Sequence, residues 1–248
     1  MSDAGAGVTA GLLGGVVPDV AVAVETFTDE IDAELFPAEE ALLARAVEKR
    51  RREFTTGRIC ARRALARLGV EPAPLLSGPK REPLWPAGVV GSITHCDGYR
   101  AAAVAWSRHL VSVGIDAEPN GPTPQGVLER ISLPSEREWI RAVSSRAPEV
   151  SWDRLLFCAK ESVYKAWFPL AQEWLGFEDA EITFTDGGPG RQGAEGAGGR
   201  SGTFVARLLV TGPVLPDGQR LTTLRGRFVV GQGLIVTALA VEPGGDAS

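Results

Sequence analysis

The sequence predicts an α+β fold, in which antiparallel strands and helices occupy separate stretches of the chain. Between residues 89 and 117, three runs read as successive strands separated by short turns, and the third of them alternates apolar and polar side chains. Two long segments, 37–68 and 151–170, instead carry apolar residues at helical spacing. Further strand-like runs follow residue 180. With 248 residues, the chain can bury one large core or form two small domains.

The first part of the chain is predicted to place a helical segment ahead of its main strands. Residues 1–19 are rich in glycine and alanine and predict a loose terminus, and 20–24 predict a short strand. Pro37 suits a first helical turn, and a helix or helix pair then runs to Leu68, with Gly69 as its natural end. The residues expected on its buried side are Phe54, Ala61, Leu65 and Leu68.

After a proline-rich loop over 71–88, three strands are predicted to form an antiparallel meander. They cover residues 89–96, 99–106 and 111–117. Asp97-Gly98 is the expected tight turn between the first two, and residues 107–110 join the second to the third. His95 and Cys96 are neighbours on a strand and face opposite sides, which argues against a Cys–His nucleophile pair.

The second part of the chain is predicted to add helices and a further set of strands. A helix is expected near 125–132, another from Ser135 with a Ser135/Glu138 capping box, and a long one capped by Ser151 that ends near Pro169. The later strands are predicted at 181–185, 203–210, 224–230 and 234–241. Between the first two of these, residues 186–202 hold eight glycines in seventeen positions and predict a mobile loop.

Composition argues against several classes of function. The net charge of −5 disfavours broad nucleic-acid binding, which needs a basic face. Three cysteines without CxxC spacing, and only two histidines, argue against a disulfide framework and a structural zinc site. Residues 4–18 lack the basic region of a signal peptide and are too short to span a membrane. We expect a cytoplasmic protein without nucleic-acid or membrane partners.

The first candidate site is a pair of carboxylates on the third predicted strand. Asp116 and Glu118 are two apart and therefore share one face of that strand. Such close like charges favour a cation between them, and a hard cation such as magnesium prefers oxygen ligands. A solvated acidic strand end before a Pro-Asn-Gly-Pro turn explains the pair equally well from the residues alone.

The second candidate site is a carboxylate flanked by lysines in the long helix. The chain has only four lysines, and Lys160 and Lys165 both lie beside Glu161. Glu161 and Lys165 are four apart and face the same way, whereas Lys160 lies about a quarter-turn from Glu161. The group is either a surface ion pair or part of a metal–polyphosphate site. A run of arginines over 50–67 is likewise either a solvated helix face or a phosphate-binding wall.

Several motifs together resemble the 4′-phosphopantetheinyl transferases, in particular the monomeric surfactin- and enterobactin-synthetase type and its actinobacterial branch. The likeness runs from about residue 45 to 170, and more faintly to the last predicted hairpin. The matching stretches are Arg51-Arg52-Glu53-Phe54 with Arg58 and Cys60-Ala61-Arg62, Arg81-Glu82-Pro83-Leu84-Trp85-Pro86, Gly91-Ser92-Ile93-Thr94-His95-Cys96, Gly114-Ile115-Asp116-Ala117-Glu118, and Ala159-Lys160-Glu161-Ser162-Val163-Tyr164-Lys165-Ala166.

The resemblance implies two pseudo-symmetric α+β halves with the active site in the cleft between them. Residues 1–112 would form the half on the 3′-phosphate and adenine side of coenzyme A, and 113–248 the metal and catalytic half. It also implies the reaction, in which the serine hydroxyl of an apo acyl or peptidyl carrier protein attacks the β-phosphate of coenzyme A. Holo carrier protein and adenosine 3′,5′-bisphosphate are the products.

The same resemblance assigns roles to the candidate residues. Asp116, Glu118 and Glu161 would hold Mg²⁺, with Mn²⁺ as an alternative, and Glu161 or a metal-held water would accept the serine proton. Lys160 and Lys165 would pair with phosphate and stabilise the leaving group, and Lys165 is the stronger candidate. The residues implied to line the coenzyme site are Arg50, Arg58, Lys80, Arg81, Thr94 and His95, and for His95 a core position is the alternative.

The expected partners are apo carrier proteins or carrier domains of polyketide, nonribosomal-peptide and fatty-acid synthases, met by a monomeric enzyme. Two other readings stay open. One is another magnesium-dependent phosphoryl enzyme, although the sequence lacks a Walker-type GxxxxGK[ST] loop. The other is a non-catalytic module that binds carrier proteins, against which the complete set of carboxylates and lysines argues.

Overall fold

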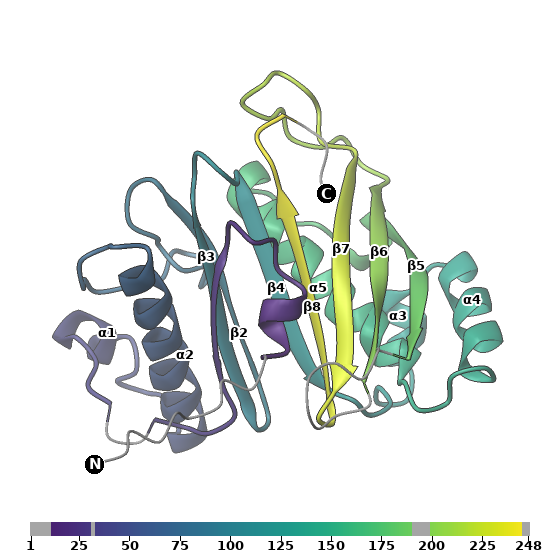
Figure 1. The fold of residues 1–248 in the computed structure, drawn as a ribbon, viewed down its shortest axis with the longest axis horizontal. Coiled ribbons are helices and arrows are strands. Elements are labelled where there is room, and N and C mark those ends of the chain that lie inside the picture. Colours follow the sequence, from purple (N-terminus) through teal and green to yellow (C-terminus); the bar gives the residue numbers. More distant parts are fainter. Residues whose placement is uncertain (1–10, 31–32, 190–198, 245–248) are drawn as a thin grey trace, which may run out of the picture.

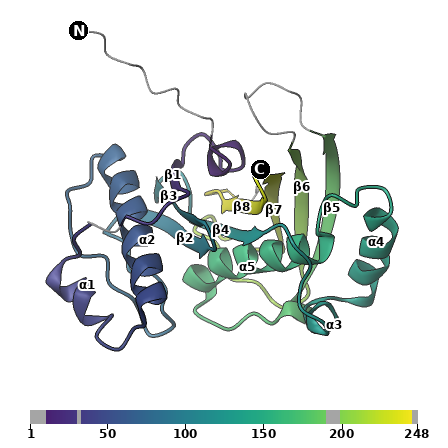
Figure 2. The same cartoon turned by 90° about the horizontal axis from the view of Figure 1, so that it is seen from below.

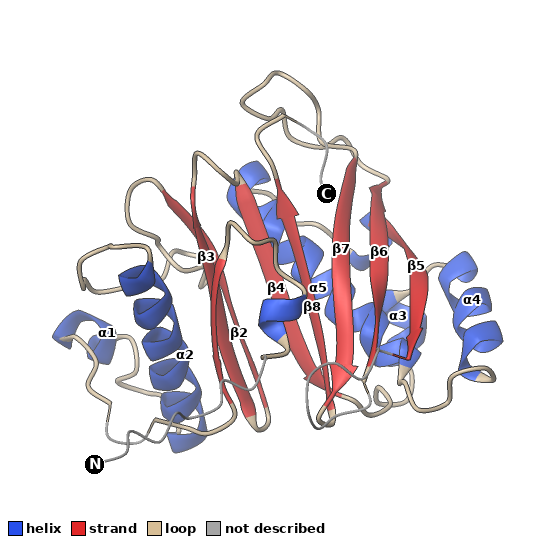
Figure 3. Cartoon of the chain, in the orientation of Figure 1, coloured by secondary structure: helices blue, strands red, loops and turns tan. Residues whose placement is uncertain are grey.

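Two antiparallel sheets lie side by side in the computed structural model, which describes residues 11–30, 33–189 and 199–244 (Figure 1). The smaller sheet has the strand order β1-β3-β2 and the larger one β4-β8-β7-β6-β5. Helices flank both sheets (Figure 3). The predicted α+β class is therefore confirmed.

The helices and strands have the following bounds. The helices are α1 (Pro37–Ala41), α2 (Glu48–Arg67), α3 (Val127–Ile131), α4 (Pro134–Ser144) and α5 (Trp152–Ala171), with short 3₁₀ turns η1 (Leu13–Gly15) and η2 (Phe177–Asp179). The strands are β1 (Val22–Thr26), β2 (Val89–Cys96), β3 (Tyr99–Trp106), β4 (Ser112–Pro119), β5 (Ala180–Pro189), β6 (Arg200–Leu208), β7 (Thr223–Gly231) and β8 (Leu234–Val241).

The smaller half is built from α2 and the three-stranded sheet. The predicted 37–68 segment is a helix pair, α1 and α2. The buried face of α2 includes Cys60, Ala61 and Ala64, which pack against Ala102 and Val104 of β3 in one core cluster. Small side chains on both elements let the helix lie close to the sheet. The Asp97-Gly98 turn between β2 and β3 is confirmed, with Gly98 at a φ of 71°.

The predicted three-stranded meander is wrong in its third strand. β2 and β3 form the expected hairpin, but β4 leaves that sheet and pairs with β8 along its whole length. Each of β2 and β4 is therefore an inner edge of its own sheet. The Oγ of Ser92 accepts the backbone N–H of Ile115 at 3.2 Å, and the Oγ1 of Thr94 accepts that of Ala117 at 3.1 Å. The equal offset of the two contacts shows that β2 and β4 run parallel along this seam.

The larger half is organised around α5, which crosses β4 and β8. Gly114 permits this approach, because a Cβ there would overlap the carbonyl oxygen of Ser162 on the helix. Aromatic rings fill the core between the other helices and the sheet; the ring centroids of Trp139 and Trp152 lie 5.2 Å apart. The helix is thereby fixed against the strand that carries Asp116.

The segment around η1 covers the seam on the face opposite to α5 (Figure 2). Leu12, Leu13, Val16 and Val17 are buried and share a core cluster with residues of β3, β4 and β8. The prediction of a loose terminus is therefore wrong for residues 11–17, and residues 1–10 lie outside the described ranges. The high glycine content of this segment favours a loose terminus, but its four apolar side chains pack against residues of both sheets.

Three local predictions also need correction. Helix α4 begins at Pro134, and the carboxylate of Glu136 accepts the N–H of Leu133 at 2.7 Å, so the predicted Ser135/Glu138 box does not form. The proline fixes φ for the first helical position and moves the start by one residue. Ser151 is the N-cap residue of α5 but its side chain makes no capping bond, and the helix continues through Pro169 to Ala171.

The predicted mobile loop over 186–202 is shorter than expected. Residues 186–189 belong to β5 and 200–202 to β6, and the rest of the predicted loop, 190–198, lies outside the described residues. In the part of the chain that the structure describes, no helix combines the length and apolar character needed to cross a membrane.

Candidate active site

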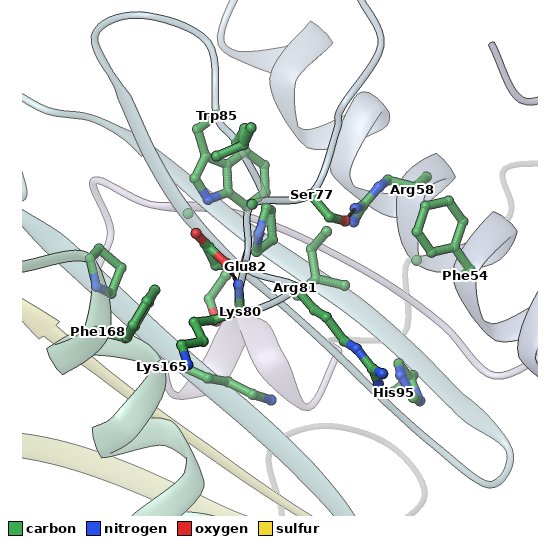
Figure 4. A pocket seen from close by; sticks show the side chains of 18 of the residues that line it. Phe54, Arg58, Ser77, Lys80, Arg81, Glu82, Trp85, His95, Lys165 and Phe168 are labelled. Carbon is green, nitrogen blue, oxygen red and sulfur yellow. Dashed lines mark hydrogen bonds between the residues drawn. The ribbon is translucent and has the colours of Figure 1, made fainter. Parts of the chain in front are cut away.

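A cavity of about 990 Å³ lies between the two halves (Figure 4). Its walls come from α2, the loop before β2 and β2 itself on one side, and from the second half of α5 on the other. Seven of the predicted site residues line it: Arg50, Arg58, Lys80, Arg81, His95, Glu161 and Lys165. Five of the seven carry a permanent positive charge, so the cavity suits a polyanionic ligand.

Arg58 is a buried guanidinium without a carboxylate partner. Its side chain comes from α2, is stacked on the ring of Phe54 at 4.4 Å, and donates to the hydroxyl of Ser77 at 3.0 Å. The residue is only 5% exposed, and its Nε is buried without a hydrogen-bond partner. Burial lowers the pKa of Arg58 to about 10, against the raising effect of Glu39. A buried cation without a counter-ion lowers the stability of the fold, so this position is suited to binding an anion.

His95 is held as a neutral ring at the same end of the cavity. Arg50 Nη1 donates to its Nε2 at 2.8 Å, which leaves the ring proton on Nδ1, 3.6 Å from the carboxylate of Glu53. Burial lowers the pKa of His95 to about 4, against the raising effect of Glu53. His95 therefore lines the site, and its predicted alternative as an enclosed core histidine is not what the structure shows.

Lys80 and Arg81 stand at the tip of a turn over residues 77–83. The turn is closed by the bond from the N–H of Gly78 to the carbonyl of Glu82 at 2.8 Å, and by the Ser77–Pro83 bridge. Arg81 adopts a φ of 69°, a left-handed conformation uncommon for a residue with a Cβ. The two exposed cations line the cavity beside Arg58.

Asp116 and Lys165 form an ion pair at the other end of the cavity. Lys165 Nζ lies 2.6 Å from Asp116 Oδ1 and also donates to the carbonyl of Ile115 at 3.1 Å. Burial lowers the pKa of Lys165, but the Asp116 carboxylate outweighs it and the net shift is upward. The hydroxyl of Thr94 donates to the same Oδ1 at 3.1 Å. The second oxygen, Oδ2, is buried and accepts no hydrogen bond of normal geometry, although the Asp116 carboxylate lies close enough to the buried Cys158 thiol to raise the pKa of that thiol.

Glu118 and Glu161 complete the acidic group around Asp116. Burial, followed by the charge of Asp116, raises the pKa of each of them. Glu118 is tied by an ion pair of 3.0 Å to Arg154, whose guanidinium also donates to the carbonyls of Gly121 and Pro122. Asp116 thus repels both glutamates, and a cation near Asp116 would relieve this repulsion.

The chemical type of the donor groups fits a magnesium ion. All three groups are carboxylates, which Mg²⁺ prefers, and the unpartnered Oδ2 of Asp116 is an acceptor that a cation would satisfy. The described residues contain no group of three or more His, Cys, Asp or Glu side chains already gathered to hold a metal. Lys165 instead supplies the positive charge at Asp116.

Four of the predicted site residues do not line the cavity: Asp116 and Glu118, described above, and Lys160 and Thr94. Lys160 Nζ lies 2.9 Å from the carboxylate of Glu136 and donates to the carbonyls of Phe177 and Ala180, and both members of this ion pair are 2% exposed. All three of its donors are committed, so its predicted role at phosphate finds no support in this arrangement. Thr94 is 2% exposed and is directed at Asp116.

Sequence reasoning missed Arg154 and a second, smaller pocket. This pocket of about 80 Å³ shares Glu161 and Tyr164 with the main cavity and is otherwise mostly apolar, with Trp174 and Phe177 in its wall. Trp174 is 75% exposed, and its ring lies 5.0 Å from that of Tyr164. In the sequence, the signal that could have indicated this pocket is a tryptophan just after the end of α5. In the structure its exposed ring marks the pocket wall.

Fold and site together are those of a protein with a cavity suited to a polyanionic ligand between two α+β halves, with carboxylates and a lysine at one end. Comparison with known families narrows this class. The model of the 4′-phosphopantetheinyl transferase N-terminal domain matches residues 38–105, and that of the 4′-phosphopantetheinyl transferase superfamily matches 112–207. The chain belongs to the 4′-phosphopantetheinyl transferase superfamily, as its motifs predicted.

Two named relatives match nearly the whole chain, and a third matches little more than half of it. It is 52% identical over 240 residues to 4′-phosphopantetheinyl transferase Svp of Streptomyces mobaraensis, covering 95% of this chain and 92% of that protein. It is also 52% identical over 227 residues to 4′-phosphopantetheinyl transferase PptT of Mycobacterium tuberculosis, covering 91% and 94%. Enterobactin synthase component D of Salmonella typhi is 40% identical over 141 residues, 57% of this chain and 58% of that protein.

Proposed function

We propose that this chain is a 4′-phosphopantetheinyl transferase that moves the phosphopantetheine arm of coenzyme A to the serine of an apo carrier protein and releases adenosine 3′,5′-bisphosphate. One observation carries the proposal beyond family membership. A single cavity joins the unpaired, buried guanidinium of Arg58 in one half to Glu161 and Lys165 in the other. Coenzyme A carries a 3′-phosphate and a pyrophosphate, which would reach these two ends of the cavity.

The half formed by residues 1–112 would bind the nucleotide end of coenzyme A. Arg58, with the exposed Arg50, Lys80 and Arg81 around it, offers several donors to the 3′-phosphate and the pyrophosphate. His95, neutral with its proton on Nδ1, adds a ring edge rather than a charge. The remaining residues, 113–248, would supply the catalytic side.

The smaller pocket would receive part of the pantetheine arm, which is uncharged where the nucleotide is anionic. It meets the main cavity at Glu161 and Tyr164, and its wall is aromatic and aliphatic where the main cavity is cationic. Coenzyme A has the same division into a charged nucleotide and a less polar arm. The bond to be broken lies at the junction of the two parts, and so would lie beside Glu161.

The transfer is a displacement at phosphorus. The serine oxygen of the carrier forms a bond to the β-phosphorus, the bond from that phosphorus to the bridging oxygen breaks, and the oxygen leaves on adenosine 3′,5′-bisphosphate. Glu161, whose pKa is raised by burial and by Asp116, is suited to accept the serine proton. Lys165, held beside Asp116, is the cation nearest to these carboxylates and suits the growing charge on the leaving oxygen.

Magnesium, bound by Asp116, Glu118 and Glu161, would neutralise charge on the phosphoryl oxygens, and Mn²⁺ would serve in its place. The support is the unpartnered Oδ2 of Asp116 and the all-carboxylate donor set. Arg154 would keep Glu118 in place through its three contacts.

The carriers that we propose as substrates are those of polyketide and nonribosomal-peptide synthases, with fatty-acid carriers as a further group. We propose that the enzyme meets them as a monomer, because the cavity described here takes residues from both halves of one chain. Since the net charge is −5, contact with an acidic carrier would depend on a local cationic or apolar patch.

Intact-mass spectrometry of an apo carrier protein incubated with this protein, coenzyme A and Mg²⁺ tests the proposal. The expected result is the addition of one phosphopantetheine arm, absent with EDTA and absent for a carrier whose serine is replaced by alanine. A folded protein that binds coenzyme A but modifies none of several carriers would instead support a non-catalytic binding module. Release of phosphate from nucleotides without carrier modification would support a different phosphoryl enzyme.

A further inference from the structure

The carboxylate of Asp116 is held from two sides at one of its oxygens. Lys165 Nζ and the hydroxyl of Thr94 both donate to Oδ1, at 2.6 and 3.1 Å. Oδ2 has no partner although it is buried, and Asp116 as a whole is 5% exposed. The two donors therefore decide which oxygen of Asp116 accepts hydrogen bonds and which is left without one.

The direction of the Thr94 hydrogen bond follows from its neighbours. The backbone N–H of Ala117 can only donate, and it donates to Thr94 Oγ1 at 3.1 Å. A hydroxyl has a single proton, so that proton is free for the carboxylate. With Thr94 itself 2% exposed, no competing water reaches this bond from bulk solvent.

The two donors belong to different halves of the molecule. Lys165 is on α5, in the same half as Asp116, whereas Thr94 is on β2 of the other half. In our proposed mechanism Lys165 serves a phosphate oxygen during transfer. Thr94 is a short side chain fixed in a strand, and it holds Asp116 whatever Lys165 does.

We propose that Thr94 is a positioning residue: across the seam between the halves, it holds Oδ1 of Asp116 so that Oδ2 is presented to the divalent cation. The inference rests on the proposed metal site and assigns Thr94 a role other than lining the coenzyme cavity. It also makes the geometry of that site depend on correct contact between β2 and β4.

Ser92 provides a matched control on the same strand. Its hydroxyl accepts the N–H of Ile115 at 3.2 Å, as that of Thr94 accepts the N–H of Ala117, but it bonds to no carboxylate of the described residues. Ser92 also lines the main cavity, so the comparison is made at saturating coenzyme A. Ser92→Ala therefore removes one seam contact and leaves Asp116 untouched. Thr94→Val removes one seam contact together with the bond to Asp116, and Thr94→Ser retains both.

The test measures Mn²⁺ binding by electron paramagnetic resonance, with coenzyme A present and no carrier protein, so that turnover plays no part. Thr94→Val should weaken Mn²⁺ binding about tenfold, the lower end of the effect of removing a hydrogen-bond partner from a metal ligand. Thr94→Ser and Ser92→Ala should bind Mn²⁺ as the wild type does. If Thr94→Val does not fold, Thr94→Ala makes the same deletion with less bulk and replaces it.

Three outcomes would overturn the inference. If Thr94→Val binds Mn²⁺ as tightly as the wild type, Thr94 does not position Asp116. If Ser92→Ala weakens binding equally, the effect belongs to the seam as a whole. If the wild type binds no Mn²⁺, the proposed metal site fails and this inference fails with it, whereas the first two outcomes leave that site intact.

Discussion

Lys165 Nζ lies 2.6 Å from Oδ1 of Asp116, so a lysine from α5 and an aspartate from β4 neutralise each other at the end of the cavity. The contact depends on the close approach of α5 to β4, and it keeps the ammonium charged because Asp116 raises its pKa. A charged donor is thereby held in place before any substrate arrives.

Replacing Lys165 by methionine should lower the rate of transfer about 100-fold, the effect typical of removing one donor that stabilises developing negative charge. The comparison is the kcat of purified variant and wild type with a saturating carrier, followed by intact mass. A loss of less than threefold at ~25 °C would mean that Lys165 serves only to neutralise Asp116.

The transfer rate should fall as the solution is acidified, because Glu161 must be ionised to take a proton or bind a cation. Burial and Asp116 raise its pKa, so the acidic limb should lie above that of a free glutamate at about 4.3. Lys165 lowers this pKa, and Lys165→Met should therefore move the limb to higher pH. The measurement is kcat against pH for both proteins; coincident limbs would contradict the assignment.

Arg58→Met should weaken coenzyme A binding and make the fold more stable. The guanidinium is buried, its Nε is unpartnered, and no carboxylate among the described residues forms an ion pair with it. Removing an uncompensated buried charge should add about 1 kcal/mol to the free energy of unfolding. Urea unfolding and calorimetric titration with coenzyme A measure the two effects. A variant that is less stable and binds normally would show that Arg58 is structural.

Lys160→Met should destabilise the fold and leave nucleotide binding unchanged. It leaves Glu136 buried without its cation and should cost about 3–5 kcal/mol of stability. The folded fraction should bind adenosine 3′,5′-bisphosphate with wild-type affinity, since Lys160 does not line the main cavity. Weakened nucleotide binding in a protein of normal stability would restore the phosphate role that the motif implied.

Gly114→Ala should destabilise the protein by about 1–3 kcal/mol, because the added Cβ has no room against α5. Forcing the helix away should also separate Lys165 from Asp116 and reduce transfer. Gly121→Ala is the control, since a Cβ there meets nothing within 4 Å. Equal stability of the two variants would show that α5 can move without penalty.

The positions of the strands can be predicted from the sequence, but the pairing of β4 with β8 cannot. The two apolar runs and the Asp97-Gly98 turn between them are local signals, and they predict the β2–β3 hairpin correctly. The pairing of β4 depends on β8, at the far end of the described chain, and no local pattern encodes that choice. The predicted meander failed for that reason.

Within the site, the motif resemblance assigns all residues of one motif to the same cavity. The periodicity of a strand or helix instead points neighbouring side chains in different directions. Thr94 and His95 are adjacent on β2 and their side chains point to opposite faces; His95 lines the cavity, whereas Thr94 is directed at Asp116. Lys160 and Lys165 differ by half a turn around α5, which places the first against Glu136 and the second against Asp116. Arg154 had no motif to reveal it.

The strand order of the larger sheet has a consequence for how the protein is made. β8 lies between β4 and β7, so β4 lacks its pairing partner until residues 234–241 have left the ribosome. The smaller sheet and α2 need nothing beyond residue 106 and can form much earlier. Pairings of such high contact order are slow, and the strand bearing Asp116 would wait as an unpaired edge throughout. The catalytic half should thus be the last to mature and the most exposed to aggregation during synthesis.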